Sequence, residues 1–448
     1  MILAVFRVRS FRFQLPADLL TSWAFEMETL ILGWYVMVQT GSVLLLTAFA
    51  SLQFLGTLAA PMFGVLGDRL GGRLMLCAMR ASYAVLGATM MGLALSGLLT
   101  PAWVFALATL IGVVRPNDLV MRNTLIGETI PPGHLMGALG MSRATADSAR
   151  VAGALAGAGL STLLGIGASY VFVTSFYLAS LALTFGVARR PMLADPGAAS
   201  DPSSTGPSPY PLPRGERGSR LPRGERGSQW RELKDGVAYV LRTPELLAFM
   251  WLAFLINLTA YPVSNGLLPY VARRVYMVDA AGLGFLVASF SLGGLLASMT
   301  VVMTGGSRSP ERSTLVHTAI WYTLLLGFGH LGSFGAGLLT LFAAGFVQNV
   351  AMISMTGALL AATADRFRGR VMGVRMLAVY GLPLGLMAAG GLIEWVGYPL
   401  TISAFSVTGL LFTLLIGIRW RASIWRRRSR AGFAGATHSG GGSEGAVT

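Results

Sequence analysis

A short charged turn between two long apolar runs constrains this chain more than any other feature. The turn is Gly64-Val65-Leu66-Gly67-Asp68-Arg69-Leu70-Gly71-Gly72-Arg73, and it joins residues 43–63 to residues 74–99. Each run is about long enough to cross a bilayer as a helix. Because lipid offers no partner for the backbone or the charges of a turn, this turn must lie at a membrane surface. Its arginines mark that surface as cytoplasmic.

The composition also predicts an integral membrane protein. Of the 448 residues, 54% are hydrophobic and 12% are charged. The net charge of +15 comes from arginines in short loops, a linker and the tail, where anchoring at the cytoplasmic surface explains them without a nucleic-acid partner. The single cysteine, Cys77, excludes an internal disulfide framework, and the four histidines show no metal-ligand spacing. We therefore expect no cofactor and no metal.

Hydropathy along the chain predicts an all-α membrane protein with twelve transmembrane helices in two pseudo-symmetric six-helix bundles. Residues 136–140, before the fifth predicted span, parallel residues 369–373, before the eleventh, which indicates that the two halves are copies of one another. Parallel repeats of six spans place a substrate site between the halves near the midplane. The predicted spans are residues 17–39, 43–66, 74–98, 102–127, 136–163, 167–188, 246–270, 280–304, 313–332, 335–361, 370–396 and 399–420.

The distribution of arginine predicts the orientation of these spans. The connections at residues 96–102, 165–169 and 332–337 hold no lysine or arginine and are predicted to be periplasmic. The opposite connections carry arginine, so both termini are predicted to face the cytoplasm of a bacterial-type inner membrane. Arg273 and Arg274 are the exception, because they fall on the outer side, where a folded external turn would explain them.

A change in composition separates the two predicted halves. The segment between them is rich in proline, glycine, serine and arginine and repeats an octapeptide, which predicts a disordered linker. Residues 230–241 are predicted to form an amphipathic helix on the inner leaflet before the seventh span. The predicted domains are the N-terminal half at residues 1–188, the linker at 189–245, the C-terminal half at 246–420 and a cytoplasmic tail at 421–448.

The charged turn resembles the loop between helices two and three of the major facilitator superfamily, usually written Gly-x-x-x-Asp-Arg-x-Gly-Arg-Arg. Gly72 stands where the family has the first of its paired arginines. The resemblance implies that Asp68 faces the start of helix eleven when the cytoplasmic side is closed, where the helix dipole favours a carboxylate. The residues that match this cytoplasmic gate motif are Gly64, Asp68, Arg69, Gly71 and Arg73.

Two further stretches resemble one branch of that superfamily. Arg115-Pro116-Asn117 and Arg150-Val151-Ala152-Gly153 look like helices four and five of the drug exporter branch that includes macrolide efflux and enterobactin export proteins. Residues 369–373 and 381–385 are similar to the same branch around helix eleven. Antiporters of the superfamily often carry a proline in a glycine motif of helix five, where this chain has Ala154.

Charged residues recur at helical spacing in the fourth and fifth predicted spans. Three and four residues apart on a helix, they share one face. Because the two spans run antiparallel from the turn at residues 131–132, the two ladders are predicted to stand side by side at matching depths, as a shared ionic network. The alternative interpretation is a permanently ionised structural brace. The two ladders are Arg115, Asp118 and Arg122 in one span and Arg143, Asp147 and Arg150 in the other.

The first span carries two further acids, Glu26 and Glu28. They point roughly 200° apart on a helix, so at most one faces a central cavity. We favour Glu28, because it shares a polar stripe with Thr21 and Tyr35. Burial raises the pKa of a carboxyl group and a nearby arginine lowers it, so a change in surroundings can change the protonation state of such an acid. An acid that takes up and releases a proton in this way would couple transport to protons.

The second half offers mainly neutral polar groups. Tyr261-Pro262 is predicted to break the seventh span, and a broken span frees carbonyl groups that line a cavity. The predicted substrate contacts are Asn257, Tyr261 and Asn349. The alternative for these residues is hydrogen bonding between neighbouring helices.

These features predict a secondary active transporter that exports a small amphipathic molecule, such as a drug or a siderophore-like compound, in exchange for protons by alternating access. The alternative within the same fold is a flippase for lysophospholipid or another lipid, in which arginines of the first half would hold a phosphate. The sequence contains no nucleophile with a base at suitable spacing, so it does not predict an enzyme. The expected partners are a small-molecule substrate, protons and membrane lipid, and the protein is expected to be a monomer.

Overall fold

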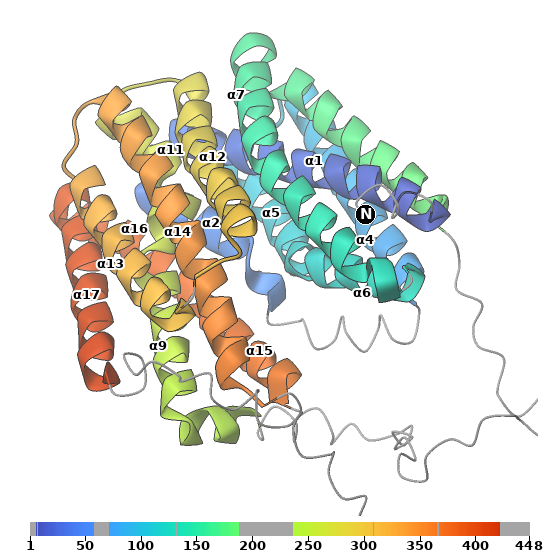
Figure 1. Ribbon diagram of the computed structural model, residues 1–448. Helices are drawn as coiled ribbons and strands as arrows, with labels where there is room; N and C mark the ends of the chain where they lie inside the picture. Colours follow the sequence, from blue (N-terminus) through green and yellow to red (C-terminus); the bar gives the residue numbers. More distant parts are fainter. Residues whose placement is uncertain are drawn as a thin grey trace, which may run out of the picture.

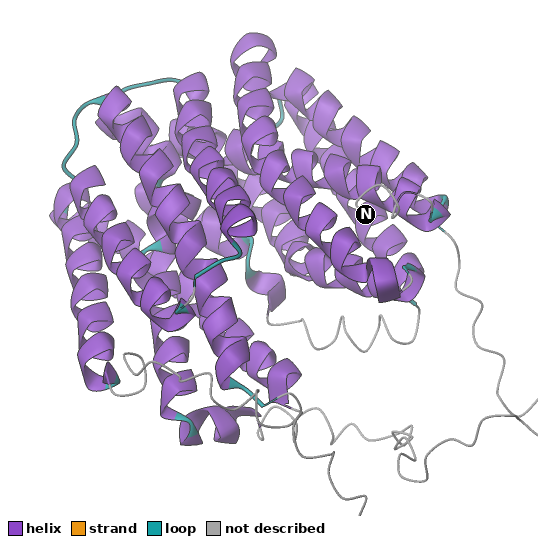
Figure 2. Cartoon of the chain, viewed as in Figure 1, coloured by secondary structure: helices purple, strands orange, loops and turns teal. Residues whose placement is uncertain are grey.

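The described part of the chain is helical and contains no strand, as the computed structural model shows in Figure 2. The structure describes residues 6, 8–57, 71–130, 132–187, 236–307, 309–364 and 367–421. The all-α class predicted from hydropathy is therefore confirmed. The predicted disordered linker lies outside the described residues up to residue 235, as does the tail from residue 422.

The N-terminal half forms one group of helices around its own apolar core (Figure 1). The core holds large buried side chains such as Met27, Ile31, Tyr83 and Tyr177. The elements of this group are α1 (Arg9–Thr40), α2 (Val43–Leu52), η2 (Leu55–Thr57), α4 (Gly72–Leu95), α5 (Pro101–Val114), η3 (Arg115–Asn117), α6 (Asp118–Thr129) and α7 (Pro132–Phe185).

The C-terminal half forms the second group, drawn from green to red in Figure 1. Its core includes Trp321, Tyr322 and Phe328. The elements are α9 (Pro244–Thr259), α10 (Tyr261–Asn265), α11 (Leu268–Tyr270), the π-helix η4 (Val271–Val275), α12 (Ala280–Thr304), α13 (Pro310–Phe328), α14 (Phe334–Ala362), α15 (Arg368–Leu377), η6 (Ala378–Tyr380), α16 (Gly381–Val396) and α17 (Tyr398–Arg419).

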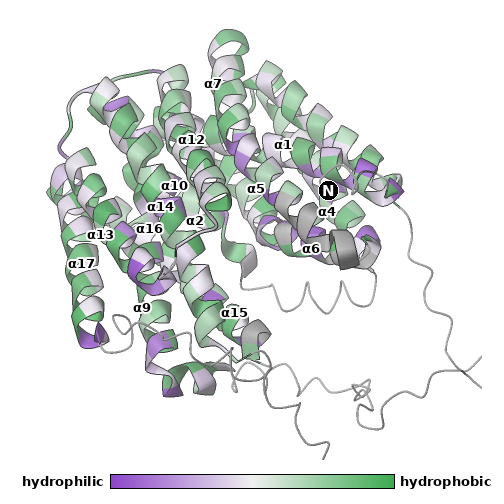
Figure 3. Cartoon of the chain, in the orientation of Figure 1, coloured by the Kyte–Doolittle hydropathy of each residue, from purple (hydrophilic) through white to green (hydrophobic). Residues whose placement is uncertain are grey.

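Several of these helices are long and apolar enough to span a bilayer, and hydrophobic residues, drawn in green in Figure 3, occur along their length. Within α7, Gly165 leaves the helical conformation with φ of +77°, at the predicted connection between the fifth and sixth spans. The count of twelve spans stays a prediction. Among the described residues, seven helices meet the length and hydropathy criteria: Gly72–Leu95, Pro101–Asn123, Met141–Phe185, Ala280–Thr304, Phe334–Ala362, Arg370–Val396 and Tyr398–Arg419.

The chain enters the second half through a short helix at residues 236–242 that meets α9 at an angle of 108°. The ring of Tyr239 on this helix stacks on Phe367 with 4.4 Å between ring centroids. The predicted amphipathic helix therefore contacts the start of α15, and its residues 230–235 lie outside the described part. Further along, α9 ends at Thr259 and α10 begins at Tyr261, which places a helix boundary at the predicted proline break.

The two halves meet mainly along two helix pairs, α2 with α16 and α7 with α12, and α1 makes smaller contacts with α11 and α12. Small residues allow the close approach. A Cβ atom on Gly390 would lie 2.1 Å from Oγ1 of Thr47, and one on Gly284 would lie 2.4 Å from Cβ of Ala158. The seam between the halves is therefore closely packed where these glycines stand.

Within the second half, α12 and α14 also pack through glycine. A Cβ atom on Gly345 would lie 1.9 Å from the carbonyl oxygen of Phe290. We expect Gly345→Leu to lower the free energy of unfolding by about 1–3 kcal/mol, because the backbones must separate to admit the side chain. Thermal melting of the purified protein measures this loss. Gly391→Leu is the matched control, since no atom lies within 4 Å of a Cβ there, and an equal loss of stability in both variants would contradict the expectation.

Candidate functional site

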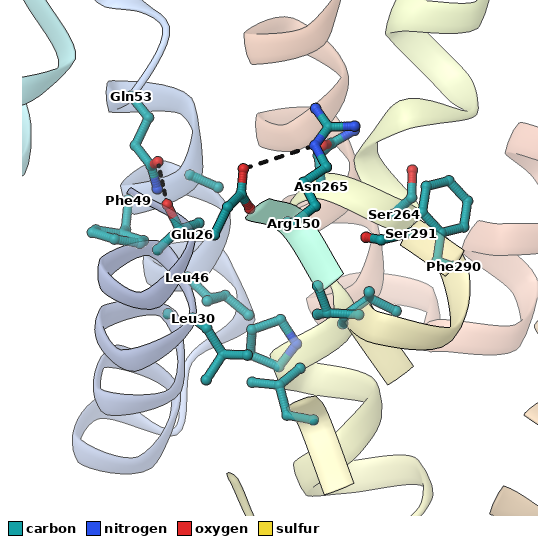
Figure 4. A pocket seen from close by; sticks show the side chains of 18 residues that line it. Glu26, Leu30, Leu46, Phe49, Gln53, Arg150, Ser264, Asn265, Phe290 and Ser291 are labelled. Carbon is teal, nitrogen blue, oxygen red and sulfur yellow. Dashed lines mark hydrogen bonds and ion pairs between the residues drawn. The ribbon is translucent and has the colours of Figure 1, made fainter. Parts of the chain in front are cut away.

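A cavity of about 100 Å³ lies where the two halves meet (Figure 4). The N-terminal half contributes side chains of α1, α2 and α7, and the C-terminal half contributes α10, α11 and α12. This volume is smaller than the roughly 300–1,000 Å³ of drug-sized ligand sites. It fits a few water molecules around charged side chains. The polar side chains in its wall are Glu26, Thr29, Gln53, Arg150, Ser264, Asn265 and Ser291.

Glu26 and Arg150 form an ion pair in the wall of this cavity, marked by a dashed line in Figure 4. Oε1 of Glu26 lies 3.7 Å from Nε of Arg150, and the side chains are 25% and 52% exposed. α1 and α7 approach closely beside the pair, because a Cβ on Gly153 would lie 2.8 Å from Cβ of Glu26. The pair is therefore accessible from the cavity rather than sealed in a core.

Glu26, not Glu28, lies in the wall of this cavity. Glu28 lines a much smaller pocket of about 10 Å³, which shares Thr29 and Gln53 with the cavity, so its role in the pathway stays a prediction. Glu28 is only 3% exposed. Its carboxylate accepts hydrogen bonds from the hydroxyl groups of Tyr170 at 3.3 Å and Tyr177 at 2.8 Å, both on the second part of α7. The polar stripe of α1 therefore faces the interior of the N-terminal half, and Glu26 is the acid at the seam.

Arg115 lines the same small pocket as Glu28. Its Nη1 donates to Oγ1 of Thr29 at 2.7 Å and to Oε1 of Gln53 at 2.8 Å. Its guanidinium also lies 4.6 Å from the ring centroid of Phe25. Among the described residues, no carboxylate lies within 4.0 Å of this guanidinium. Neutral polar groups and an aromatic face thus hold this charge close to the cavity, because Thr29 and Gln53 also line it.

Four buried charges form a second cluster inside the N-terminal half, which we call the ionic quartet: Asp18, Arg80, Asp118 and Arg122. Asp18 accepts a hydrogen bond from Nη2 of Arg80, and Oδ2 of Asp118 pairs with Nε of Arg122. Nε of Arg122 also lies 3.6 Å from Oδ1 of Asp18. All four side chains are at most 6% exposed. Their formal charges cancel, which is how charges are tolerated in such surroundings.

The two predicted ladders do not form one lateral network. Arg122 bonds to α1, donating to Oγ of Ser22 at 2.8 Å and to the carbonyl oxygen of Asp18 at 3.1 Å. On α7, Nε of Arg143 lies 3.4 Å from Oδ2 of Asp147. The ion pairs of the described residues thus join each ladder to α1 or to itself. Both helices contact α1, and each ladder finds a partner there: Arg122 lies near Asp18 and Arg150 near Glu26.

The predicted contacts of the second half have helix partners. Nδ2 of Asn349 donates to Oγ of Ser298 at 2.7 Å, which joins α14 to α12. Nδ2 of Asn257 donates to the carbonyl oxygen of Ala253 in its own helix at 2.9 Å. These contacts match the alternative of hydrogen bonding within the helix bundle.

Tyr261 differs from these two, because it packs against a cluster of Ala50, Leu382 and Leu386 that joins the first half to the second. Its hydroxyl accepts from Nε2 of Gln348 at 2.8 Å, and its ring packs edge-on against Trp321 at 5.4 Å between centroids. Tyr261 is therefore the residue of the predicted set that faces the seam.

The cytoplasmic gate motif is only partly described. Gly64, Asp68 and Arg69 lie outside the described residues, so their predicted contact with the start of helix eleven stays a prediction. Gly71 precedes α4 with φ of +82°, a conformation that favours glycine. Nη2 of Arg73 donates to the carbonyl oxygen of Phe185 at 2.5 Å and ties the start of α4 to the end of α7.

Asp18 and Arg80 were not among the predicted site residues. Each is an isolated charge within a predicted span, and such a charge signals a paired or functional group. That signal was available in the sequence. Their pairing was not, because it depends on how α1 and α4 are rotated.

The sequence matches a model of a known protein family. The model described as Major Facilitator Superfamily matches residues 17–306, which is more than half of the chain. The chain belongs to the major facilitator superfamily. Transporters of this superfamily consist of two halves, and the central cavity lies at the interface between them. The protein is therefore a multi-pass membrane transporter rather than an enzyme.

Solved structures of other transporters share the fold of this superfamily member. A bacterial homologue of the human lysosomal transporter Spinster, in an inward-facing and unoccupied conformation, has 15% identity and a TM-score of 0.63, covering 91% of this chain and 95% of that one. The nucleoside transporter NupG has 12% identity and a TM-score of 0.68, covering 92% and 99%. The human organic anion transporter MFSD10 has 17% identity and a TM-score of 0.56, covering 91% and 99%. No curated protein matches the sequence.

Proposed function

We propose that this protein exports a small amphipathic molecule in exchange for protons by alternating access, and that Glu26 is the group that takes up the proton. The observation that carries the proposal is the Glu26–Arg150 ion pair in a cavity whose walls come from both halves. A carboxylate that both halves surround is in a position to sense their relative movement. Asp18, Asp118 and Glu28, which also have their partners in the N-terminal half, do not line this cavity.

Protonation of Glu26 changes the charge of the cavity by one unit. The deprotonated carboxylate neutralises Arg150, whereas the protonated acid leaves the guanidinium without its anionic partner. An uncompensated cation inside a bilayer is costly unless water or a ligand surrounds it. The two protonation states therefore favour different degrees of closure around the cavity, and a difference of this kind shifts the populations of the two arrangements.

The proposal assigns the described arrangement to a state closed at the outer side. Near the predicted periplasmic end, Oγ of Ser42 donates to Oε1 of Glu394 at 2.9 Å, which joins α2 to α16. Beside the cavity, a Cβ on Gly33 of α1 would lie 3.4 Å from Cγ of Pro269 on α11, and both residues line it. Small residues at these contacts suit a seam that packs in one state and separates in the other.

Transport by purified protein in proteoliposomes tests the proposal. We expect an imposed pH gradient to drive movement of at least one compound from a panel of cationic dyes, catechol siderophores and lysophospholipids, with a matching proton flux. Dissipating the gradient with a protonophore should reduce accumulation at least about tenfold, the factor that corresponds to 1.4 kcal/mol of driving force. Movement of lysophospholipid that ignores the gradient would instead favour the lipid flippase.

A further inference from the structure

Two adjacent arginines line a pocket at the end of the molecule that carries the predicted periplasmic connections. Arg273 and Arg274 belong to the π-helix η4, and the pocket has a volume of about 320 Å³. The end of α1 supplies the opposite wall with Met37, Val38 and Gly41. The pocket therefore lies across the seam between the two halves, separate from the central cavity.

Both guanidinium groups lack an acidic partner. Among the described residues, no carboxylate oxygen lies within 4.0 Å of either arginine. The two acids of neighbouring elements are already bound: Asp279 accepts from the backbone nitrogen of Gly282 at 2.9 Å, and Glu394 accepts from Ser42. Two like charges side by side therefore face the pocket uncompensated.

The local backbone brings these charges to the seam. A π-helix is rare and is frequent at functional sites, and η4 carries both arginines. Gly41 ends α1 with φ of +64°, and a Cβ there would lie 3.5 Å from Nη2 of Arg274. The guanidinium of Arg273 lies 5.9 Å from the ring centroid of Trp34 on α1. Each arginine thus reaches across from the second half toward the first.

Membrane targeting does not explain this pair. Lysine and arginine collect in connections on the cytoplasmic side, and three other connections at this end, residues 96–102, 165–169 and 332–337, have none. Guanidinium groups form paired hydrogen bonds with phosphate oxygens, and two neighbouring arginines match the charge of one phosphate group. The pocket also stands at the end of the helices, where lipid headgroups lie.

We propose that this pocket is an anion site that binds a phosphate group, from a lipid headgroup or from free phosphate, and that the bound anion holds this end of the two halves together. Repulsion between the two guanidinium groups opposes their approach to α1, and a bound anion removes that repulsion. Occupation therefore shifts the protein toward the arrangement that is closed at this end.

Thermal melting in detergent tests binding, with inorganic phosphate and with soluble short-chain phosphatidylglycerol as separate probes and chloride at equal ionic strength as the reference. We expect a saturating probe to raise Tm by about 3 °C in the parent protein. The rise should disappear in R273Q/R274Q and persist in R419Q, whose arginine also lies over a tryptophan but at the opposite end. If the double variant does not fold, R274Q alone should weaken binding about tenfold.

Each outcome decides the proposal. A rise with both probes supports a site for free phosphate, and a rise with the lipid alone supports a headgroup site. No rise with either probe, or a rise that persists in the arginine variants, overturns it. For the closing effect, spin labels at Leu98 and Leu339, in a Cys77→Ser background, should show a larger population of short distances with the bound probe. An unchanged distance distribution would overturn that part.

Discussion

Replacement of Arg80 by methionine should lower the free energy of unfolding by about 3–5 kcal/mol, because it leaves a buried carboxylate without a cation that compensates it. Asp18 is 2% exposed at its side chain and bonds directly to Arg80. Oγ1 of Thr184 loses the same donor. Thermal melting of the purified protein, with the amount of folded protein after extraction as a second readout, measures the loss.

The double variant D18N/R80M is the control that separates charge from packing. It removes one positive and one negative charge, so the remaining pair of Asp118 and Arg122 is again neutral. We expect it to recover a large part of the lost stability, which a double-mutant cycle expresses as a coupling energy. If R80M melts like the parent protein, or if the double variant is no more stable than R80M, the ionic quartet does not stabilise the fold by charge compensation.

Replacement of Glu26 by glutamine should reduce transport driven by a pH gradient at least about a hundredfold, a loss that corresponds to 2.7 kcal/mol. Glutamine keeps the size and polarity of the side chain but cannot exchange a proton. Because Glu26 is one-quarter exposed at the cavity, we expect its replacement to leave the fold intact, and Tm should change little. Initial rates of proton-coupled uptake in proteoliposomes measure the effect.

Glu311→Gln is the matched control for that experiment, since Glu311 lies in the first turn of α13, away from the central cavity. It makes the same chemical change in the second half and should transport at the parent rate. Equal coupled rates in E26Q and the parent protein would remove Glu26 from the coupling mechanism. A large fall in Tm of E26Q would instead identify the pair with Arg150 as a structural brace.

Apolar runs, glycines and the charged turn made the helical membrane fold predictable. Runs of about 20 apolar residues define spans without any knowledge of tertiary structure, because backbone polar groups must be satisfied within the segment. The break at Gly165 and the one at Tyr261-Pro262 were also readable, since their residues favour turns or remove a backbone donor.

The pairing of charges was less predictable, because spacing along a helix gives the face that residues share but not what that face contacts. Arg115, Asp118 and Arg122 do share one helical region, yet Arg122 bonds to Ser22 and Asp18 of α1 rather than to the second ladder. Glu28 shows the same limit. Its polar stripe was visible, but only the packing of α1 against α7 shows that the stripe meets Tyr170 and Tyr177.

The dependence of the transporter's conformation on pH tests most directly whether Glu26 couples protonation to the movement of the halves. Spin labels at Leu74 on α4 and Val302 on α12, in a Cys77→Ser background, report the distance between the halves at the predicted cytoplasmic end. Both sites are exposed, at 55% and 81%. We predict two distance populations whose ratio changes with pH in the parent protein and stays constant in E26Q. A ratio that responds to pH equally in both proteins would contradict the account.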